Sequence, residues 1–227
     1  MMDDVGGIPL IYKSHKRAKK MKLKFDALSG CGVVTVPTFC SKLEAFRFAG
    51  RHRDWLEAQK KSSPQKVLLM PGNVIPFLGD EKIIHHKKDN SSGVEITQEH
   101  IIVGGPIEGF PVRLENYLKK TAGKYIEPIA AQFAETAGVR YKKIQIRDTK
   151  SRWGSSSTTG TLSFSWRLIM TPPDILKYVV AHEIAHIREM NHSAAFWSQV
   201  DQLVENAKPA RRWLRSEGQA LMYICRH

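Results

Sequence analysis

The pentad His182-Glu183-Ile184-Ala185-His186 is the feature that most limits how this chain can fold. It follows an apolar run over 178–181, which favours a helix. On an α-helix, residues four positions apart differ by about 40° in azimuth and about 6 Å in rise, so both imidazoles lean toward a shared metal. Glu183 then does not bind the metal but lies close enough to take a proton from a metal-bound water. The pentad therefore predicts a helix that carries a zinc site for hydrolysis.

A third histidine, His192, follows shortly after the pentad. The stretch 191–193 is typical of a helix end followed by a new N-cap, which lets His192 turn back toward the metal. Three protein ligands with one open position characterise catalytic zinc, because structural sites fill all four positions and usually recruit cysteine. The alternative is that these histidines are ordinary core and surface residues, which requires the spacing and the adjacent carboxylate to coincide by chance.

The composition describes a soluble globular chain. Its 227 residues are 42% hydrophobic and 25% charged, which allows a buried core and argues against disorder. No stretch approaches 18 consecutive apolar residues, and the N-terminus over 1–4 carries acid where a signal peptide carries base. The cysteines lack C-x-x-C spacing, which favours reduced thiols. We therefore expect a cytoplasmic protein that does not cross a membrane.

The net charge of +13 favours contact with polyanions. The densest basic run, 13–25, ends in lysines alternating with Met, Leu and Phe, as in a half-buried strand with a charged outer face. A solvated strand face and a nucleic-acid patch both remain open for this run. Its basic part lacks aromatic residues, which weakens the case for stacking on single strands.

The order of hydrophobic patterns predicts an α+β protein in two parts. A β-rich N-terminal part covers 1–105, and a zincin-like catalytic domain with the H-E-x-x-H helix covers 106–227, although a loop inside one domain at 104–106 is the alternative. Strands are expected near 20–27, 32–37, 67–70, 74–78, 83–84, 94–96, 101–103, 139–147 and 161–168, those from 67 to 103 as a small antiparallel sheet. Helices are expected over 41–61, 111–137, the pentad and two closing segments, the first of them capped by Ser193.

A hydrolase also needs groups that hold the substrate and stabilise the developing oxyanion. The segment 151–155 and the strand 161–168 are candidates for an edge to which an extended peptide pairs. The sequence does not choose among the oxyanion candidates Arg152, Tyr178 and Tyr223. The candidate substrate-binding residues are Arg152, Trp153, Gly154 and Tyr178.

Several motifs together resemble the YgjP-like metal-dependent hydrolases, which are zincins related to the SprT and WLM metallopeptidases. The resemblance extends over essentially the whole chain and is most specific in its C-terminal motifs. These motifs are Arg152-Trp153-Gly154-Ser155, Trp166-Arg167-Leu168-Ile169, Pro172, Tyr178-Val179-Val180, the pentad, Asn191-His192-Ser193 and Phe196-Trp197.

This resemblance implies an α+β zincin fold with His182, His186 and His192 as zinc ligands and Glu183 as the catalytic residue. The chain departs from the family at Ser156, where cysteine is common, and at Ser165, where asparagine is common. Neither position is a proposed ligand, so the departures concern the substrate site. The histidine spacing also matches metzincins, but Glu189 stands where that pattern requires glycine.

The function that these patterns favour is a zinc metallopeptidase that cleaves an unknown protein or peptide. One alternative is a DNA-associated protease similar to the SprT group, whose basic N-terminal part holds nucleic acid. Another is a non-catalytic, zinc-containing nucleic-acid-binding module. Glu183 argues against the last, because a structural zinc site has no use for a general base.

Overall fold

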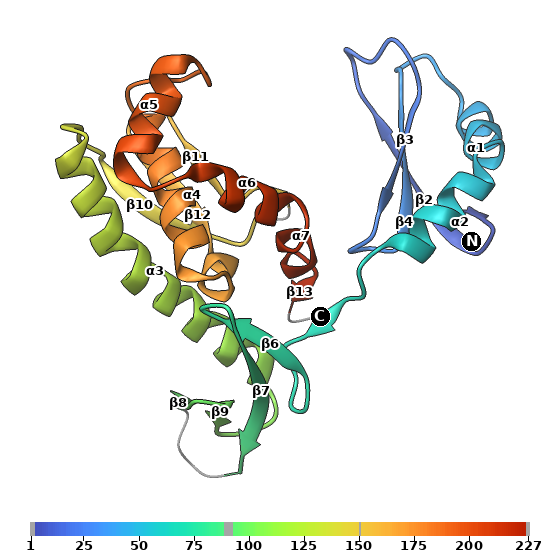
Figure 1. Ribbon diagram of the computed structural model, residues 1–227. Coiled ribbons are helices and arrows are strands. Elements are labelled where there is room, and N and C mark those ends of the chain that lie inside the picture. The colour runs from blue at the N-terminus through green and yellow to red at the C-terminus, as the bar shows by residue number, and fades with distance from the viewer. Residues whose placement is uncertain (1–2, 89–92, 150, 226–227) are drawn as a thin grey trace. The chain divides into compact units, whose positions relative to one another are not determined.

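The computed structural model describes residues 3–88, 93–149 and 151–225. It divides the chain into two compact units, Met1–Lys66 and Val67–His227 (Figure 1). Each unit has a hydrophobic core of its own. The division expected from the sequence lay at 105/106. Residues on both sides of that position instead share one core, because Ile75 and Ile101 join the same buried cluster as Leu114. The described residues contain no helix of sufficient length and apolarity to cross a membrane.

The first unit combines a four-stranded sheet with two helices. The strands follow the order β1-β2-β4-β3, with β2 parallel and β3 antiparallel to β4. In β3 the lysines are exposed and Leu23 and Phe25 half-buried, as the alternation predicts. The elements are β1 (Asp4–Val5), β2 (Ile8–Ser14), β3 (Lys22–Asp26), β4 (Cys31–Val36), α1 (Lys42–Gly50) and α2 (Arg53–Ser62).

The single helix expected over 41–61 is two helices, α1 and α2. A capping box between Ser41 and Glu44 begins α1. The break falls at His52, whose backbone (φ −112°, ψ 25°) leaves the helical region. Its ring Nδ1 lies 2.9 Å from the carbonyl oxygen of Phe48, and this contact satisfies one of the carbonyl groups that a helix end leaves without a partner.

The second unit opens with short strands that form a mixed sheet of order β6-β7-β9-β8. Strand β9 runs parallel to β7, and the remaining neighbours are antiparallel, so the prediction of a purely antiparallel sheet is wrong. The reason is the order: β8 lies at the edge beside β9, and β9 itself occupies the place beside β7. The strands of this sheet are β6 (Val74–Phe77), β7 (Asp80–Lys87), β8 (Val94–Ile96) and β9 (His100–Gly104). Strand β5 (Val67–Leu68) precedes them and is not part of the sheet.

The rest of this unit includes a long helix, α3, which runs without interruption through Pro128 and buries one face. A second sheet has the order β10-β12-β11, with β12 in the middle. The elements are α3 (Phe110–Thr136), β10 (Lys143–Arg147), β11 (Gly154–Ser156), β12 (Thr161–Ser165), a 3-10 helix (Trp166–Met170), α4 (Pro173–Ala185), α5 (Ala194–Leu203), α6 (Ala207–Arg215), α7 (Gly218–Leu221) and β13 (Ile224–Cys225).

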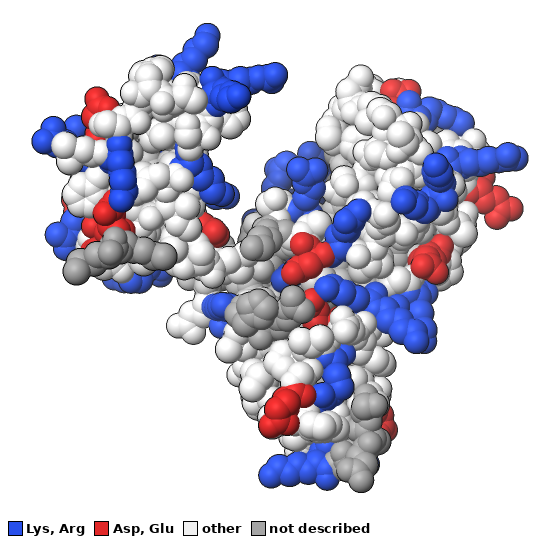
Figure 2. All heavy atoms as spheres, turned by 180° about the vertical axis from the view of Figure 1, so that it is seen from behind, with Lys and Arg blue, Asp and Glu red and all other residues white. Residues whose placement is uncertain are grey.

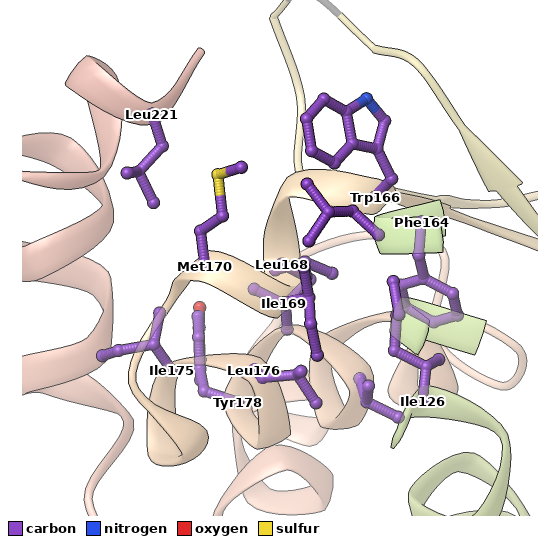
Figure 3. Packing of buried hydrophobic residues seen from close by; sticks show 14 of the residues in the cluster. Ile126, Phe164, Trp166, Leu168, Ile169, Met170, Ile175, Leu176, Tyr178 and Leu221 are labelled. Carbon is purple, nitrogen blue, oxygen red and sulfur yellow. The ribbon is translucent and has the colours of Figure 1, made fainter. Parts of the chain in front are cut away.

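The core of the second unit is built around the 3-10 helix and α4. Figure 3 shows Leu168 and Ile169 of the 3-10 helix beside Leu176 of α4, with Phe164 and Trp166 nearby. All five side chains are almost completely buried. Burying such large apolar side chains contributes about 1.5–3 kcal/mol each, so this packing holds α4 firmly in position.

Arg167 is a buried cation in this core and connects it to the end of the chain. Its side chain is almost inaccessible to solvent, and its Nε and Nη2 donate to the carbonyl oxygen of Ile224 at 3.0 and 2.8 Å. Nη1 donates to Asp148 Oδ1 at 2.5 Å, and the guanidinium lies 4.6 Å from the ring centroid of Trp166. One side chain thus anchors β13, which pairs with β5.

Replacing Arg167 with lysine is expected to lower the free energy of unfolding by about 2 kcal/mol, because an ammonium cannot reproduce the planar set of donors and leaves buried acceptors unsatisfied. Urea denaturation followed by tryptophan fluorescence measures the change. Arg140→Lys is the control, since Arg140 is exposed. Equal midpoints for the two variants would contradict the anchoring role.

Candidate metal centre

Helix α4 presents the pentad at its C-terminal end. His182 to Ala185 are its last residues, and His186 is its C-cap with helical backbone angles (φ −65°, ψ −14°). Ser193 caps the next helix, α5, by accepting a hydrogen bond from the backbone N–H of Phe196 at 3.3 Å, as predicted. The short connection between the two helices brings His192 back beside the end of α4.

Three ring nitrogens converge at this point. The Nε2 atom of His182 lies 3.2 Å from Nε2 of His186 and 3.3 Å from Nε2 of His192. The candidate ligand atoms of the three residues all lie within 4.8 Å of one another. Tetrahedral zinc with its usual bonds to imidazole places neighbouring nitrogens about 3.3 Å apart. The three histidines therefore fit a zinc ion.

Aromatic side chains hold the three imidazoles in place. Phe196 is fully buried, and its ring centroid lies 4.5 Å from that of His186, 4.9 Å from His182 and 4.8 Å from His192. Trp197 stacks on His192 with centroids 5.8 Å apart and planes inclined by 28°. The carbonyl oxygen of Glu189 lies 2.9 Å from Nδ1 of His186, which orients that ring with Nε2 toward the other histidines.

The surroundings of His182 and His186 favour the neutral imidazole. Burial lowers the pKa of His182 to about 3, and the charges on His186, His192 and Arg211 add to this effect. Burial also lowers the pKa of His186, although its hydrogen bond to the Glu189 carbonyl acts in the opposite direction. A neutral imidazole is the form that binds a metal ion, so these shifts favour ligation at neutral pH.

Glu183 is buried against the edge of the second sheet. Its exposed fraction is 5%, and burial raises its pKa to about 8, while the charge of Arg152 opposes the shift. A Cβ atom added to Gly154 at the start of β11 would lie 2.6 Å from Glu183 Oε1 and 2.7 Å from its Cγ. Gly154, selected from the sequence as a substrate-binding residue, thus makes room for the carboxylate.

The other candidate substrate residues occupy different surroundings. Tyr178 is buried one turn before His182, with its hydroxyl 3.4 Å from Nδ1 of that histidine, and burial raises its pKa to about 12. Arg152 is exposed, and the indole of Trp153 lies beside Gly218 of α7. Tyr223, the third oxyanion candidate, lies in the turn between α7 and β13.

Strand β11 forms one edge of the second sheet, and β10 forms the other. The sequence left 151–155 and 161–168 open as the peptide-pairing edge, but β12 within the latter is paired on both sides. Strand β11 pairs only with β12 among the described strands, and its first residue, Gly154, contacts Glu183. The edge strand and the carboxylate are therefore neighbours.

A hollow of about 440 Å³ adjoins the histidines. Several of the residues that line it were not among the site residues predicted from the sequence. It is lined by Tyr178, His182, His192, Trp197, Arg211, Leu214 and Arg215. The spacing of Arg211 and Arg215 puts both on one face of α6, which a helical reading of this segment predicts. No local pattern connects that face with the pentad, because α6 and α4 meet only in the folded chain.

A histidine triad beside a buried carboxylate, on a mixed α+β scaffold, is the kind of site found in metal-dependent hydrolases. Residues 19–217 match the YgjP-like metallopeptidase domain. This match covers most of the chain, so the chain belongs to the YgjP-like metallopeptidase family. The match confirms the resemblance seen in the motifs.

Two solved structures are similar to part of the chain. One is the metallopeptidase zymogen abylysin of Pyrococcus abyssi, with 22% identity and a TM-score of 0.37 over 40% of this chain and 95% of that one. The other is the metallopeptidase zymogen jannalysin of Methanocaldococcus jannaschii, with 20% identity and a TM-score of 0.36 over 41% of this chain and 95% of that one. No curated protein matches the chain.

Proposed function

We propose that this protein is a zinc-dependent peptidase of zincin-like architecture, in which His182, His186 and His192 hold the metal and Glu183 is the general base. The observation that carries the proposal is the convergence of three imidazole nitrogens, with His182 Nε2 lying 3.2 and 3.3 Å from the other two, together with the buried Glu183 that follows His182 in the chain. Membership in a metallopeptidase family supports peptide-bond hydrolysis as the reaction.

Each group of the site has a defined part in the proposed reaction. A zinc ion bound by the triad supplies Lewis acidity and lowers the pKa of a water molecule toward about 7. Glu183 would take a proton at a carboxylate oxygen from the water that adds to the peptide carbonyl carbon, and would deliver it to the amine nitrogen as the C–N bond breaks. Strand β11 offers its free edge to an extended peptide, which would place a substrate backbone beside Glu183.

The test compares metal content and peptide cleavage in the wild type and in His186→Ala. We expect about one zinc per chain in the wild type, measured by elemental analysis, and cleavage of an unfolded-protein library that a chelator abolishes and zinc restores. His186→Ala should lose both, because one ligand of three is gone. Finding iron, manganese or cobalt instead would reassign the metal.

The matched control is His85→Ala, since His85 is an exposed histidine of strand β7. This variant should keep its zinc and its activity. A wild type without metal, or a His186→Ala protein that retains full zinc content, would overturn the assignment of the triad.

A further inference from the structure

Basic side chains are spread widely over this protein. On the face that Figure 2 displays, both units carry Lys and Arg side chains, with Asp and Glu among them. The net charge therefore does not by itself identify a binding site. One basic group differs from the others by its position, because it lies on the wall of the hollow beside the histidine triad.

That group belongs to helix α6. Arg211 and Arg215 line the hollow of about 440 Å³ together with His182 and His192. They also line a second hollow of about 520 Å³ with Lys208, Arg212 and Ser216. On the same helix Ala207 and Ala210 are buried, whereas Arg211 is half-buried and Arg215 is exposed.

Arg211 is held in a fixed orientation. Its guanidinium carbon lies 4.2 Å from the ring centroid of Trp197, and that ring stacks on His192. Stacking of this kind occupies the face of a guanidinium and leaves the N–H donors at its edge available. The stack therefore connects a cation with free donors directly to a proposed metal ligand.

Neither arginine has a carboxylate partner within the described part of the chain, where no ion pair to Arg211 or Arg215 is found. No acidic residue lines the hollow beside the triad. Asp201 lines an adjoining hollow with Arg211, but Arg215 is absent from that lining. A pair of unpaired guanidinium groups over a small hollow is suited to a single oxyanion.

We propose that Arg211 and Arg215 bind an anionic group of the substrate, a carboxylate or a phosphate, and so select peptides with an acidic or phosphorylated residue near the cleaved bond. The proposal rests on the peptidase function proposed above and names its substrate class. The cluster is confined to one short helix beside the site, which favours a single side chain over the extended backbone of a nucleic acid.

The first experiment measures binding without turnover. Glu183→Gln protein loaded with zinc is titrated by calorimetry with three blocked peptides that differ only in a central glutamate, phosphoserine or glutamine. We expect the anionic peptides to bind about 10- to 100-fold more tightly than the glutamine peptide. Adding Arg211→Gln and Arg215→Gln should remove this difference, and the glutamate and phosphoserine arms identify the preferred anion.

The second experiment measures cleavage of the same peptides by zinc-loaded protein with Glu183 intact. The Arg211→Gln/Arg215→Gln variant should show a raised KM for the anionic peptides, and little change for the glutamine peptide. Arg212→Gln is the matched control, because Arg212 lies on the same helix but does not line the hollow beside the histidines. Its preference should equal that of the wild type.

The outcomes separate this proposal from the peptidase function. Selective binding of anionic peptides without any cleavage would support the anion site and count against the peptidase. Efficient cleavage with no preference between glutamate and glutamine would overturn the anion site and leave the peptidase standing. Loss of binding to a DNA oligonucleotide, but not to the peptides, in the double arginine variant would reassign the cluster to nucleic acid and overturn the proposal.

Discussion

Replacing Glu183 with glutamine is expected to lower kcat for peptide cleavage by roughly 10²- to 10⁴-fold while leaving the zinc content unchanged. Glutamine has nearly the same shape, so it keeps the packing against Gly154 and does not disturb the three histidines. Its amide cannot accept the proton that the carboxylate takes up. The loss therefore isolates proton transfer from metal binding.

The measurement pairs single-turnover kinetics with elemental analysis of the same samples. Glu135→Gln is the control, because Glu135 is exposed near the end of α3 and the substitution changes charge in the same way. Activity within a few-fold of the wild type in Glu183→Gln would contradict the role of Glu183 as general base. Loss of zinc would instead show that its charge supports the metal site.

Replacing Gly154 with alanine is expected to lower kcat by roughly 100-fold, since a catalytic group displaced by about 1 Å loses rate on this scale. The added Cβ would lie 2.6 Å from Oε1 and 2.8 Å from Cδ of Glu183, closer than van der Waals contact allows. Glu183 is almost fully buried, so its carboxylate must shift. The proposed metal ligands are other residues, so the metal content should stay the same.

A double-mutant comparison shows whether the effect acts through Glu183. In the Glu183→Gln background, adding Gly154→Ala should cost little further activity, because the base is already missing. Gly93→Ala is the control, as no atom lies within 4 Å of its added Cβ. If Gly154→Ala lowers activity equally with and without the carboxylate at position 183, the glycine acts on something else.

Much of the fold was predictable where the signal is local. The spacing of apolar residues predicted α3 over 111–137, and the structure has it over Phe110–Thr136. The same kind of signal failed at His52, where one helix becomes two because a side chain satisfies the end of α1. Strands β1 and β2 were missed. Strand β1 has only two residues, and most of β2 lies before the basic run in which the strand signal was sought.

The compact units were less predictable than their elements. Glycine and proline at 104–106 suggested a division there, yet the residues before and after it bury their side chains in one cluster. A turn signal reports local backbone geometry and contains no information on which core the flanking strands join. The parallel pairing of β9 with β7 was hidden for the same reason.

The sequence by itself determined the mixed α+β character, the family, and the selection of His182, His186 and Glu183. The two histidines could be selected because helical spacing places residues four apart on one face. Only the tertiary structure decided that Gly154 touches Glu183 and that Arg211 and Arg215 border the triad. These contacts join segments far apart along the chain. They depend on how α4 packs against β11 and α6, and a residue's sequence neighbours do not encode that packing.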